Sequence, residues 1–429
     1  MLRDPLDLPR LFRALAAEHA DVFWLDAGAG AVEGWSILGV GVPDAAGPWH
    51  VRLDAGATRD PGEPPFRDGW VGWLDYETGA RRAAAPAAEP EGGPAWMRVA
   101  SAVAVDHATG AVWELGMPLP LRPDPSTGSE TETRPAAEPV EASDLLPPAA
   151  SARHTPDEYA TLIERCREVI RAGDAYQLCL TTRFTVPGEH DPVETYLRLR
   201  EATPAHHGGF VRIGERALLS ASPETFLRAT GGVVRTRPIK GTRPRGTDAG
   251  SDAALAAELL ASPKERAENV MIVDLMRNDL ARVCEPGSIS VEGLWEVESY
   301  PAVHQLVSTV SGRISDGVTA QRLWDAAFPA GSMTGAPKLS AMTVLHELES
   351  ARPRGVYSGC FGYVGVDGEL DLAMVIRSIL VERDRAVVGA GGGITWGSVA
   401  DAEVDEVAVK ARAPLAALGA TLAQVWRRG

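Results

Sequence analysis

The chain has 429 residues, and its 58 acidic side chains outnumber 42 basic ones, which gives a formal net charge of −16. With 45% hydrophobic and 23% charged residues, the composition is that of a folded globular protein and excludes a mainly disordered chain. The negative charge opposes binding to nucleic-acid phosphates, and no apolar run approaches the roughly 18 residues of a membrane span, so we expect a cytoplasmic protein with neither nucleic acid nor membrane as a partner.

A segment rich in Pro, Glu, Ser and Thr divides the chain. It covers residues 118–154 and holds eight prolines between positions 118 and 148, too many for a helix or a central strand. We therefore predict an N-terminal region at 1–117, a linker or surface insertion at 118–154, and a larger domain at 155–429.

The larger part opens with a clear helix signal. Thr155 supplies an N-cap, Pro156 occupies the first helical position and Glu158 completes a capping box. Apolar positions then recur with the helical period until Gly173, which predicts the end of the helix. Alternating residues predict a strand at 175–186.

Further strands and helices follow towards the C-terminus. The predicted strands are 217–221, 226–229, 233–237, 359–366, 370–382 and 386–389. The predicted helices are a capped one running from Ser262 towards Arg282, then 321–328, 337–350 and a last one after residue 400. Strands that follow one another in hairpins, with helices interspersed, predict an α+β fold.

The densest basic segment is 235–246, with five cations. In an acidic chain it is a candidate anion pocket, although composition alone slightly favours a solvated loop. Lys240 is followed by Gly241, which permits close approach of a ligand to the backbone, and a lysine in such a place can act as a nucleophile. Glu224 ends a strand-like run and can act as a proton donor if it is buried beside a leaving group. An isolated Glu in a turn is more often a solvated surface residue.

Two of the predicted helices carry stacked carboxylates. Glu265 and Glu268 share one face of the helix from Ser262, and Glu403, Glu406 and Lys410 share one face of the last helix. If the two helices face each other, their carboxylates form an oxygen-rich site suited to Mg²⁺. Otherwise they are two ordinary exposed faces.

Glycines at 389, 391, 392 and 393 follow a predicted strand. Successive bare amides can form a nest for a carboxylate or phosphate, and a plain glycine turn is the alternative. The Lys-Ser/Thr ending of a phosphate loop and the spacing of a dinucleotide fingerprint are both missing.

Several blocks of sequence, taken in order, carry a family resemblance. They are Gly-Asp-Ala-Tyr-Gln at 173–177, Ser-Pro-Glu-Thr-Phe at 222–226, Pro-Ile-Lys-Gly-Thr at 238–242, Asp-Leu-Met-Arg-Asn-Asp-Leu at 274–280, Leu-Val-Ser-Thr-Val at 306–310 and Phe-Pro-Ala-Gly-Ser-Met-Thr-Gly-Ala-Pro-Lys at 328–338. These blocks resemble the chorismate-utilising enzymes, which include component I of anthranilate synthase, component I of aminodeoxychorismate synthase, and isochorismate and salicylate synthases. The resemblance implies a two-lobed α+β fold in which large antiparallel sheets pack as a sandwich with helices outside, and it makes 155–429 a chorismate-binding catalytic domain.

The resemblance also implies roles for individual residues. Lys240 matches a nucleophile that forms a covalent adduct with chorismate, and Glu224 matches an acid that protonates the departing hydroxyl. The implied Mg²⁺ ligands are Glu268 and Glu406, with Glu265 and Glu403 as supporting carboxylates. The implied substrate-binding residues are Thr242, Tyr357, Arg377, Gly391, Gly392, Gly393 and Lys410.

Two positions point to a reaction within the family. Anthranilate synthases typically carry Ala where this chain has Lys240, and Pro-Ile-Lys-Gly-Thr looks like component I of aminodeoxychorismate synthase. Before Leu-Val-Ser the family usually has a His that is linked, in anthranilate synthase, to pyruvate elimination, whereas this chain has Gln305 with His304 one place earlier.

We therefore expect conversion of chorismate and ammonia to 4-amino-4-deoxychorismate, which serves 4-aminobenzoate and folate or a secondary metabolite. Anthranilate synthase component I is the alternative, and a non-catalytic chorismate-binding homologue is an alternative of another class. Because the chain shows no glutaminase nucleophile elbow, the resemblance implies a separate glutamine amidotransferase subunit as the ammonia source.

Overall fold

Antiparallel strands build two sheets that meet at one long strand, β4 (Ala95–Asp106). The computed structural model describes residues 6–54, 62–119, 148–301 and 303–426. Its helices are α1 (Leu8–Glu18), α2 (Tyr76–Arg82), α3 (Pro156–Ala172), α4 (Pro192–Ala202), α5 (Ala249–Ala261), α6 (Pro263–Leu280), α7 (Ala320–Ala327), α8 (Gly331–Thr334), α9 (Lys338–Leu348) and α10 (Ala400–Ala417). None of the helices within these ranges has the length and apolar character needed to cross a membrane.

The first sheet runs from one edge of β4. Its strands, in order of pairing, are β2 (Trp35–Pro43), β1 (Val22–Asp26), β8 (His207–Ile213), β9 (Arg216–Ser222), β18 (Ser378–Val381), β19 (Arg385–Ile394) and β7 (Gln177–Pro187). The far edge of β7 pairs with β6 (Ala149–Ala152) and β15 (Gly335–Ala336), and β6 pairs in parallel with β20 (Thr421–Leu422).

The second sheet runs from the other edge of β4, where β5 (Val112–Gly116) also pairs. Its strands, in order of pairing, are β3 (Gly69–Leu74), β16 (Cys360–Gly365), β17 (Leu370–Met374), β10 (Thr225–Thr230), β11 (Val233–Thr236) and β14 (Val303–Arg313). β12 (Ile239–Pro244) follows β11 along one edge of β14, and β13 (Ser290–Ser299) pairs with the other edge.

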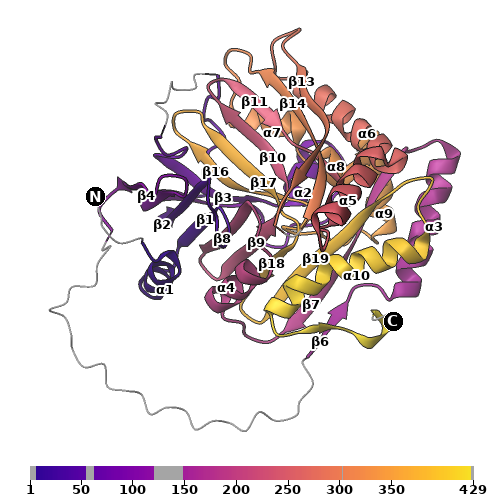
Figure 1. Cartoon of the computed structure of the whole chain (residues 1–429), viewed down its shortest axis with the longest axis horizontal. Coiled ribbons are helices and arrows are strands. Elements are labelled where there is room, and N and C mark those ends of the chain that lie inside the picture. Colours follow the sequence, from indigo (N-terminus) through magenta and orange to yellow (C-terminus); the bar gives the residue numbers. More distant parts are fainter. Residues whose placement is uncertain (1–5, 55–61, 120–147, 302, 427–429) are drawn as a thin grey trace, which may run out of the picture.

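Three apolar clusters show that the two sheets pack as a sandwich with helices outside. One cluster joins the facing sides of both sheets and contains Phe23, Trp73 and Phe361. A second lies between the first sheet and helices that include α1, α3 and α10, and a third between the second sheet and helices that include α6 and α7. In Figure 1, α10 lies across β7 and β19, and α5 and α6 lie near β13 and β14. The predicted α+β class is confirmed.

Strands from the N-terminal region are shared with the rest of the chain. β1 pairs with β8 and β3 pairs with β16, so the parts expected at 1–117 and 155–429 contribute to the same two sheets. Of the segment expected as a linker at 118–154, residues 120–147 lie outside the described residues, and Ala149–Ala152 form β6.

Most of the elements predicted from local signals are present, although others, such as α1, α4 and β14, were not predicted. The capping box at Thr155 is present, and Gly173 ends α3 with φ of +88°. Two predictions were wrong. The strand expected at 370–382 is divided into β17 and β18, because the backbone turns at Arg377, which has φ of +52°. The glycines at 389–393 form neither a nest nor a turn, because β19 continues through them and pairs with β7.

Candidate active site

Two crossings between the sheets lie side by side. The chain passes from the first sheet to the second between β9 and β10, where Glu224 lies, and returns between β17 and β18, where Arg377 lies. Backbone hydrogen bonds join the crossings, because Met374 N–H donates to the Glu224 carbonyl at 3.0 Å and Ala221 N–H donates to the Arg377 carbonyl at 3.3 Å. Residues far apart in sequence are thus held together where the sheets exchange strands.

A cavity of about 520 Å³ opens beside these crossings. It lies among β12, β19, α6, α10 and the two crossings. The structure brings all thirteen predicted site residues to its wall: Glu224, Lys240, Thr242, Glu265, Glu268, Tyr357, Arg377, Gly391, Gly392, Gly393, Glu403, Glu406 and Lys410. Their proposed roles remain predictions, but their convergence rules out the alternative that the acidic helix faces are unrelated exposed surfaces.

Lys240 projects from an irregular part of β12. The register against β14 shifts between Ile239 and Thr242, which places Lys240 and Gly241 in a bulge. Gly241 has φ of +85°, and a Cβ added there would lie 3.0 Å from the Glu265 side chain, so a glycine allows the strand to approach α6 closely. Among the described residues, the Lys240 ammonium has no hydrogen-bond or ion-pair partner.

Glu224 lies deep in the cavity, with 8% of its surface exposed. Burial raises the pKa of its carboxyl to about 7, although the nearby Lys240 and the hydrogen bond from Ser332 act in the opposite direction. Ser332 Oγ donates to Glu224 Oε1 at 3.0 Å and fixes the orientation of the carboxyl group. A carboxyl with a pKa near neutrality can hold a proton and release it to a leaving group.

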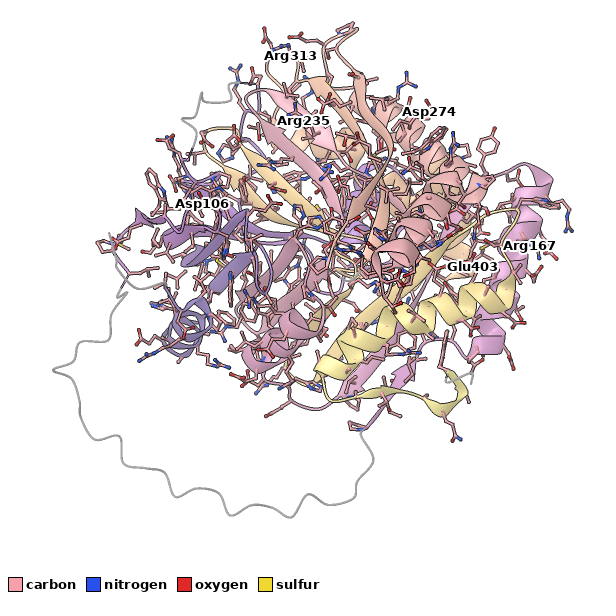
Figure 2. The ribbon with its side chains drawn as sticks, in the orientation of Figure 1. Asp106, Arg167, Arg235, Asp274, Arg313 and Glu403 are labelled. Carbon is pink, nitrogen blue, oxygen red and sulfur yellow. The ribbon has the colours of Figure 1, made fainter. Side chains whose placement is uncertain are left out.

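Four carboxylates from α6 and α10 face the cavity, and Glu403 is marked on α10 in Figure 2. Burial raises the pKa of Glu268, although the nearby cations Lys240 and Lys264 act in the opposite direction. Burial also raises the pKa of Glu403, whose Oε1 accepts a hydrogen bond from Ser398 Oγ at 2.7 Å. The chain's own cations only partly offset the effect of burial on Glu268 and Glu403.

Glu406 has a closer cation than Glu265, which lies 3.5 Å from Arg243, or Glu268, which lies 4.0 Å from Lys264. Burial tends to raise the pKa of Glu406, but Lys410 Nζ lies 2.8 Å from its Oε1 and lowers the pKa overall. Lys410 also donates to the Gly391 carbonyl at 2.8 Å. The contact with Gly391 ties α10 to β19 at the edge of the cavity.

The carboxylates suit a hard cation. Mg²⁺ prefers carboxylate oxygens and keeps several waters, and a divalent ion would stabilise the ionised forms of Glu268 and Glu403, whose pKa burial raises. Within the described ranges, no three His, Cys, Asp or Glu side chains close around a common point. The donor set therefore fits a metal that takes part of its coordination from water or a ligand.

The glycines of β19 present backbone to the cavity. Lys410 binds the carbonyl of Gly391, and the opposite residue Thr181 donates its N–H to Glu349 instead of to β19, so the backbone groups of Gly391 face away from β7. Because backbone N–H and C=O groups point to alternate sides from one residue to the next along a strand, those of Gly393 also face away from β7. These amides remain available to an anionic ligand even though the predicted nest does not form.

Tyr357 and Arg377 complete the wall. A Cβ added to Gly389 would lie 2.1 Å from Cγ of Tyr357, so the ring packs directly on bare backbone. Burial raises the pKa of the Tyr357 hydroxyl and lowers the pKa of Arg377. Within the described chain, the Arg377 guanidinium has no hydrogen-bond or ion-pair partner, which leaves its fork of donors for a ligand.

The structure distinguishes His304 from Gln305. Gln305 pairs with Thr242 and lines the cavity, whereas His304 pairs with Arg243. The His304 ring lies 2.9 Å from Asp252 Oδ1 and 2.8 Å from Ser299 Oγ, and it does not reach the cavity wall. A glutamine therefore occupies the place where the family usually has its histidine.

Sequence reasoning missed three residues at or near the cavity. Ser332 and Lys264 line it, and Ser332 lay in a quoted block without an assigned role. Gln177 is fully buried, and both atoms of its amide lack a partner. A Cβ placed on Gly393 would lie 2.3 Å from Gln177 Nε2 and 3.5 Å from Lys240 Nζ, so this amide lies close to the lysine.

Comparison with known proteins agrees with the geometry. Residues 40–416 match the family model described as chorismate binding enzyme. The aminodeoxychorismate synthase of Streptomyces pristinaespiralis is 43% identical over 369 residues, which cover 82% of this chain and 51% of that protein. Anthranilate synthase component 1 of Streptomyces coelicolor is 39% identical over 379 residues, which cover 83% of this chain and 74% of that protein. The chain thus spans about half the length of the first relative.

Two solved structures share the fold. Anthranilate synthase component I from Streptococcus pneumoniae superposes with a TM-score of 0.67 at 31% identity, over 83% of this chain and 82% of that chain. The menaquinone-specific isochorismate synthase of Escherichia coli superposes with a TM-score of 0.71 over 97% of this chain and 92% of that chain, and at 16% identity it supports the fold alone. The chain belongs to the chorismate binding enzyme family.

Proposed function

We propose that the chain aminates chorismate at C4 to give 4-amino-4-deoxychorismate. The observation that carries the proposal is Lys240, which lies unpaired in the wall of the family's cavity together with the buried carboxyl of Glu224. The similarity to aminodeoxychorismate synthase from Streptomyces pristinaespiralis supports it. The position of Gln305 in the cavity wall, with His304 directed elsewhere, supports it against pyruvate elimination.

The proposed chemistry proceeds in two displacements. The unprotonated amine of Lys240 forms a bond to C2 while the bond from C4 to its hydroxyl breaks, and Glu224 gives its proton to the departing oxygen, which leaves as water. Ammonia then forms a bond to C4, and the electron pair of the bond between C2 and the lysine nitrogen returns to the amine. The sum consumes chorismate and ammonia and releases the aminated product and water.

Cations and amides would hold the two carboxylates of chorismate. Arg377 offers a planar fork of donors that suits a carboxylate, and Lys410 adds a second positive charge at the edge of β19. The backbone N–H groups of Gly391 and Gly393 face away from β7, and Thr242 lies opposite Gln305 on the same wall. This local set explains how a chain with a net charge of −16 can bind a dianion.

Mg²⁺ is the cofactor that we propose, with Glu268 and Glu406 as ligands and Glu265 and Glu403 as supporting carboxylates. The bound ion would act as a Lewis acid and offset the charge of a substrate carboxylate. The chain's own part is to hold α6 and α10 so that their carboxylates converge. Lys410 prepares the site because it keeps Glu406 ionised.

A separate glutamine amidotransferase subunit is proposed as the source of ammonia, in the cytoplasm. The relative from Klebsiella aerogenes, which is 43% identical over 268 residues, is named component 1, and such a name is typical of an enzyme with a second component. We also propose that 155–429 is the catalytic domain and that 118–154 is a linker or insertion. The product would serve 4-aminobenzoate and folate or a secondary metabolite.

The identity of the product tests the proposal. Purified protein is incubated with chorismate, ammonium and Mg²⁺, and the products are identified by mass spectrometry. We expect 4-amino-4-deoxychorismate, with 4-aminobenzoate formed only after a lyase is added. Direct formation of fluorescent anthranilate would instead establish the second candidate, which the relative from Streptomyces coelicolor favours. Chorismate binding without turnover in calorimetry would support a non-catalytic homologue.

A further inference from the structure

A pair of buried polar side chains lies behind the strand that carries Lys240. Asn269 and Ser308 are both fully buried. Ser308 Oγ donates to Asn269 Oδ1 at 2.6 Å. The carbonyl of Pro238 accepts both from Asn269 Nδ2 at 3.4 Å and from the backbone N–H of Ser308 at 3.2 Å. The pair therefore holds one specific carbonyl from two sides.

Asn269, Ser308 and Pro238 belong to three different elements, and these elements must keep a fixed position relative to one another. Asn269 follows Glu268 on α6 and lies one turn after Glu265. Ser308 lies on β14, and Pro238 immediately precedes β12, two residues before Lys240. A fixed Pro238 carbonyl thus links the lysine strand to the helix that carries the carboxylates.

Regular strand pairing does not fix Lys240 by itself. The register shift between Ile239 and Thr242 leaves Lys240 and Gly241 outside the regular ladder. Ladder pairs at Ile239 and Thr242 flank the bulge, and the Pro238 carbonyl adds a further attachment point beside Ile239. Any loosening at Pro238 would let the bulge move relative to α6.

The neighbouring strand, β13, is distorted where it contacts the pair formed by Asn269 and Ser308. Trp295 has φ of +58°, which is unfavourable for a residue other than glycine, and its N–H donates to Ser308 Oγ at 3.0 Å. The guanidinium of Arg266, also on α6, lies 3.8 Å from the centre of the Trp295 ring. Trp295, a strained residue, thus orients the Ser308 hydroxyl towards Asn269. It also contacts α6, through Arg266.

We infer that Asn269 and Ser308 are positioning residues, which act through the Pro238 carbonyl to hold Lys240 in register with the carboxylates of α6. The inference rests on the proposed function in giving Lys240 its role. Neither side chain lines the cavity, so both act on the reaction through the elements that they hold.

Ser308→Ala tests the inference. The change leaves Asn269 Oδ1 and the Trp295 N–H without a partner, and kcat for amination should fall by about tenfold or more, while KM for chorismate stays within about twofold. The double variant Asn269→Leu with Ser308→Ala removes both members of the pair and should regain much of the lost thermal stability. We expect kcat of the double variant to remain low.

Ser36→Ala is the matched control. Ser36 is also a fully buried serine, its Oγ donates to Asp26 Oδ1 at 3.1 Å, and it lies on β2 away from the cavity. This variant should lose stability and keep its kcat. The inference is overturned if Ser308→Ala keeps the kcat of the unmodified enzyme, or if the double variant regains kcat together with stability.

A measurement without turnover separates this inference from the proposed function. Reductive methylation followed by mass spectrometry reports the accessibility of each lysine amine. In Ser308→Ala the rate at Lys240 should rise relative to Lys410, whatever product the enzyme makes. An unchanged ratio contradicts the positioning role, whereas the wrong product from the unmodified enzyme contradicts only the proposed function.

Discussion

Two groups of buried charges lie next to each other in this protein, and they are organised in opposite ways. One is the Arg354 cluster, formed by Arg354, Glu349 and Glu77. Arg354 donates twice to Glu349, at 2.8 and 2.9 Å, and its side chain also donates to the carbonyls of Cys179 and Met333. The other group lines the cavity, to which Cys179 and Met333 also contribute.

The Arg354 cluster is fully paired. Glu77 accepts the backbone N–H groups of Arg354 and Gly355 at 2.7 and 3.0 Å, and Glu349 also accepts from the backbone and hydroxyl of Thr181. Such a network tolerates burial because every charge has partners. In the cavity, Lys240 and Arg377 have no hydrogen-bond or ion-pair partner among the described residues, and burial raises the pKa of Glu268 although Lys264 lies 4.0 Å from it. The comparison shows which buried charges serve the fold and which are left for a ligand.

The largest expected effect is on activity, and it distinguishes the charges that line the cavity from the Arg354 cluster. Lys240→Ala should lower the rate of C4 amination about a thousandfold or more, because it removes the proposed nucleophile. Steady-state rates with ammonium and chorismate measure this loss. Lys240→Arg keeps the charge, so substantial activity in that variant would show that charge, not nucleophilicity, is what the site needs.

Glu224 should give the activity a pH dependence. Its pKa is raised to about 7, so the acid form needed for proton donation is present below pH 7 and is lost as the pH rises above it. We expect this descending limb in kcat/KM when the concentration of free ammonia is held constant across the series. Glu224→Gln should lose about 10²- to 10⁴-fold in rate, and a retained limb in its residual activity would assign the limb to another group.

Breaking the Arg354 cluster should instead damage the fold. Arg354→Met leaves Glu349 buried without its charge partner, and the free energy of unfolding should fall by about 3–5 kcal/mol. Urea denaturation measures the change. Replacing both partners, as in Arg354→Met with Glu349→Leu, should restore part of the stability, and failure of Arg354→Met to shift the midpoint would contradict the distinction drawn here.

Glu406→Gln should act through the metal. The change removes an anionic oxygen, and the Mg²⁺ concentration for half-maximal activity should rise by about 10- to 100-fold or more. Titration of activity with Mg²⁺ measures it. Asp405→Asn is the control, since Asp405 is exposed on the same helix and does not line the cavity; an equal shift in both variants would point to a general charge effect.

The smallest expected effect is on stability. Glu268→Gln should stabilise the protein slightly, whereas Arg354→Met should destabilise it. The folded-state pKa of Glu268 is raised, so stability is lost as the pH rises from the unfolded-state pKa through the folded-state pKa. At pH 8 without Mg²⁺, Glu268→Gln should therefore unfold at a slightly higher temperature while activity falls. At pH 4, where the carboxyl is largely protonated in both states, the two proteins should unfold alike.

Sequence predicted what depends on local signals and on side-chain type. The cap at Thr155 and the end at Gly173 were both correct because these residues act on their own helix. The carboxylates of α6 and α10 could be proposed as a pair because helical spacing fixes which residues share a face. The family resemblance then supplied the order in which the segments meet.

The remainder depends on pairing between distant segments. The break at Arg377 follows from a change of sheet, which no residue nearby announces. The extended glycines of β19 are set by ten paired residues of β7. The unpartnered amide of Gln177 and the bond between Ser308 and Asn269 become visible only when three or more elements are assembled.

The hydrogen bonds that join the two crossings between the sheets have a consequence for how members of the family can differ. Because Met374 N–H donates to the Glu224 carbonyl and Ala221 N–H donates to the Arg377 carbonyl, the two crossings move together if one sheet slides over the other. Lys240 is not part of either crossing, because it lies on a bulge of β12. Under the proposed function, a change of the residue at 240 could therefore alter the reaction while Glu224 and Arg377 keep their positions.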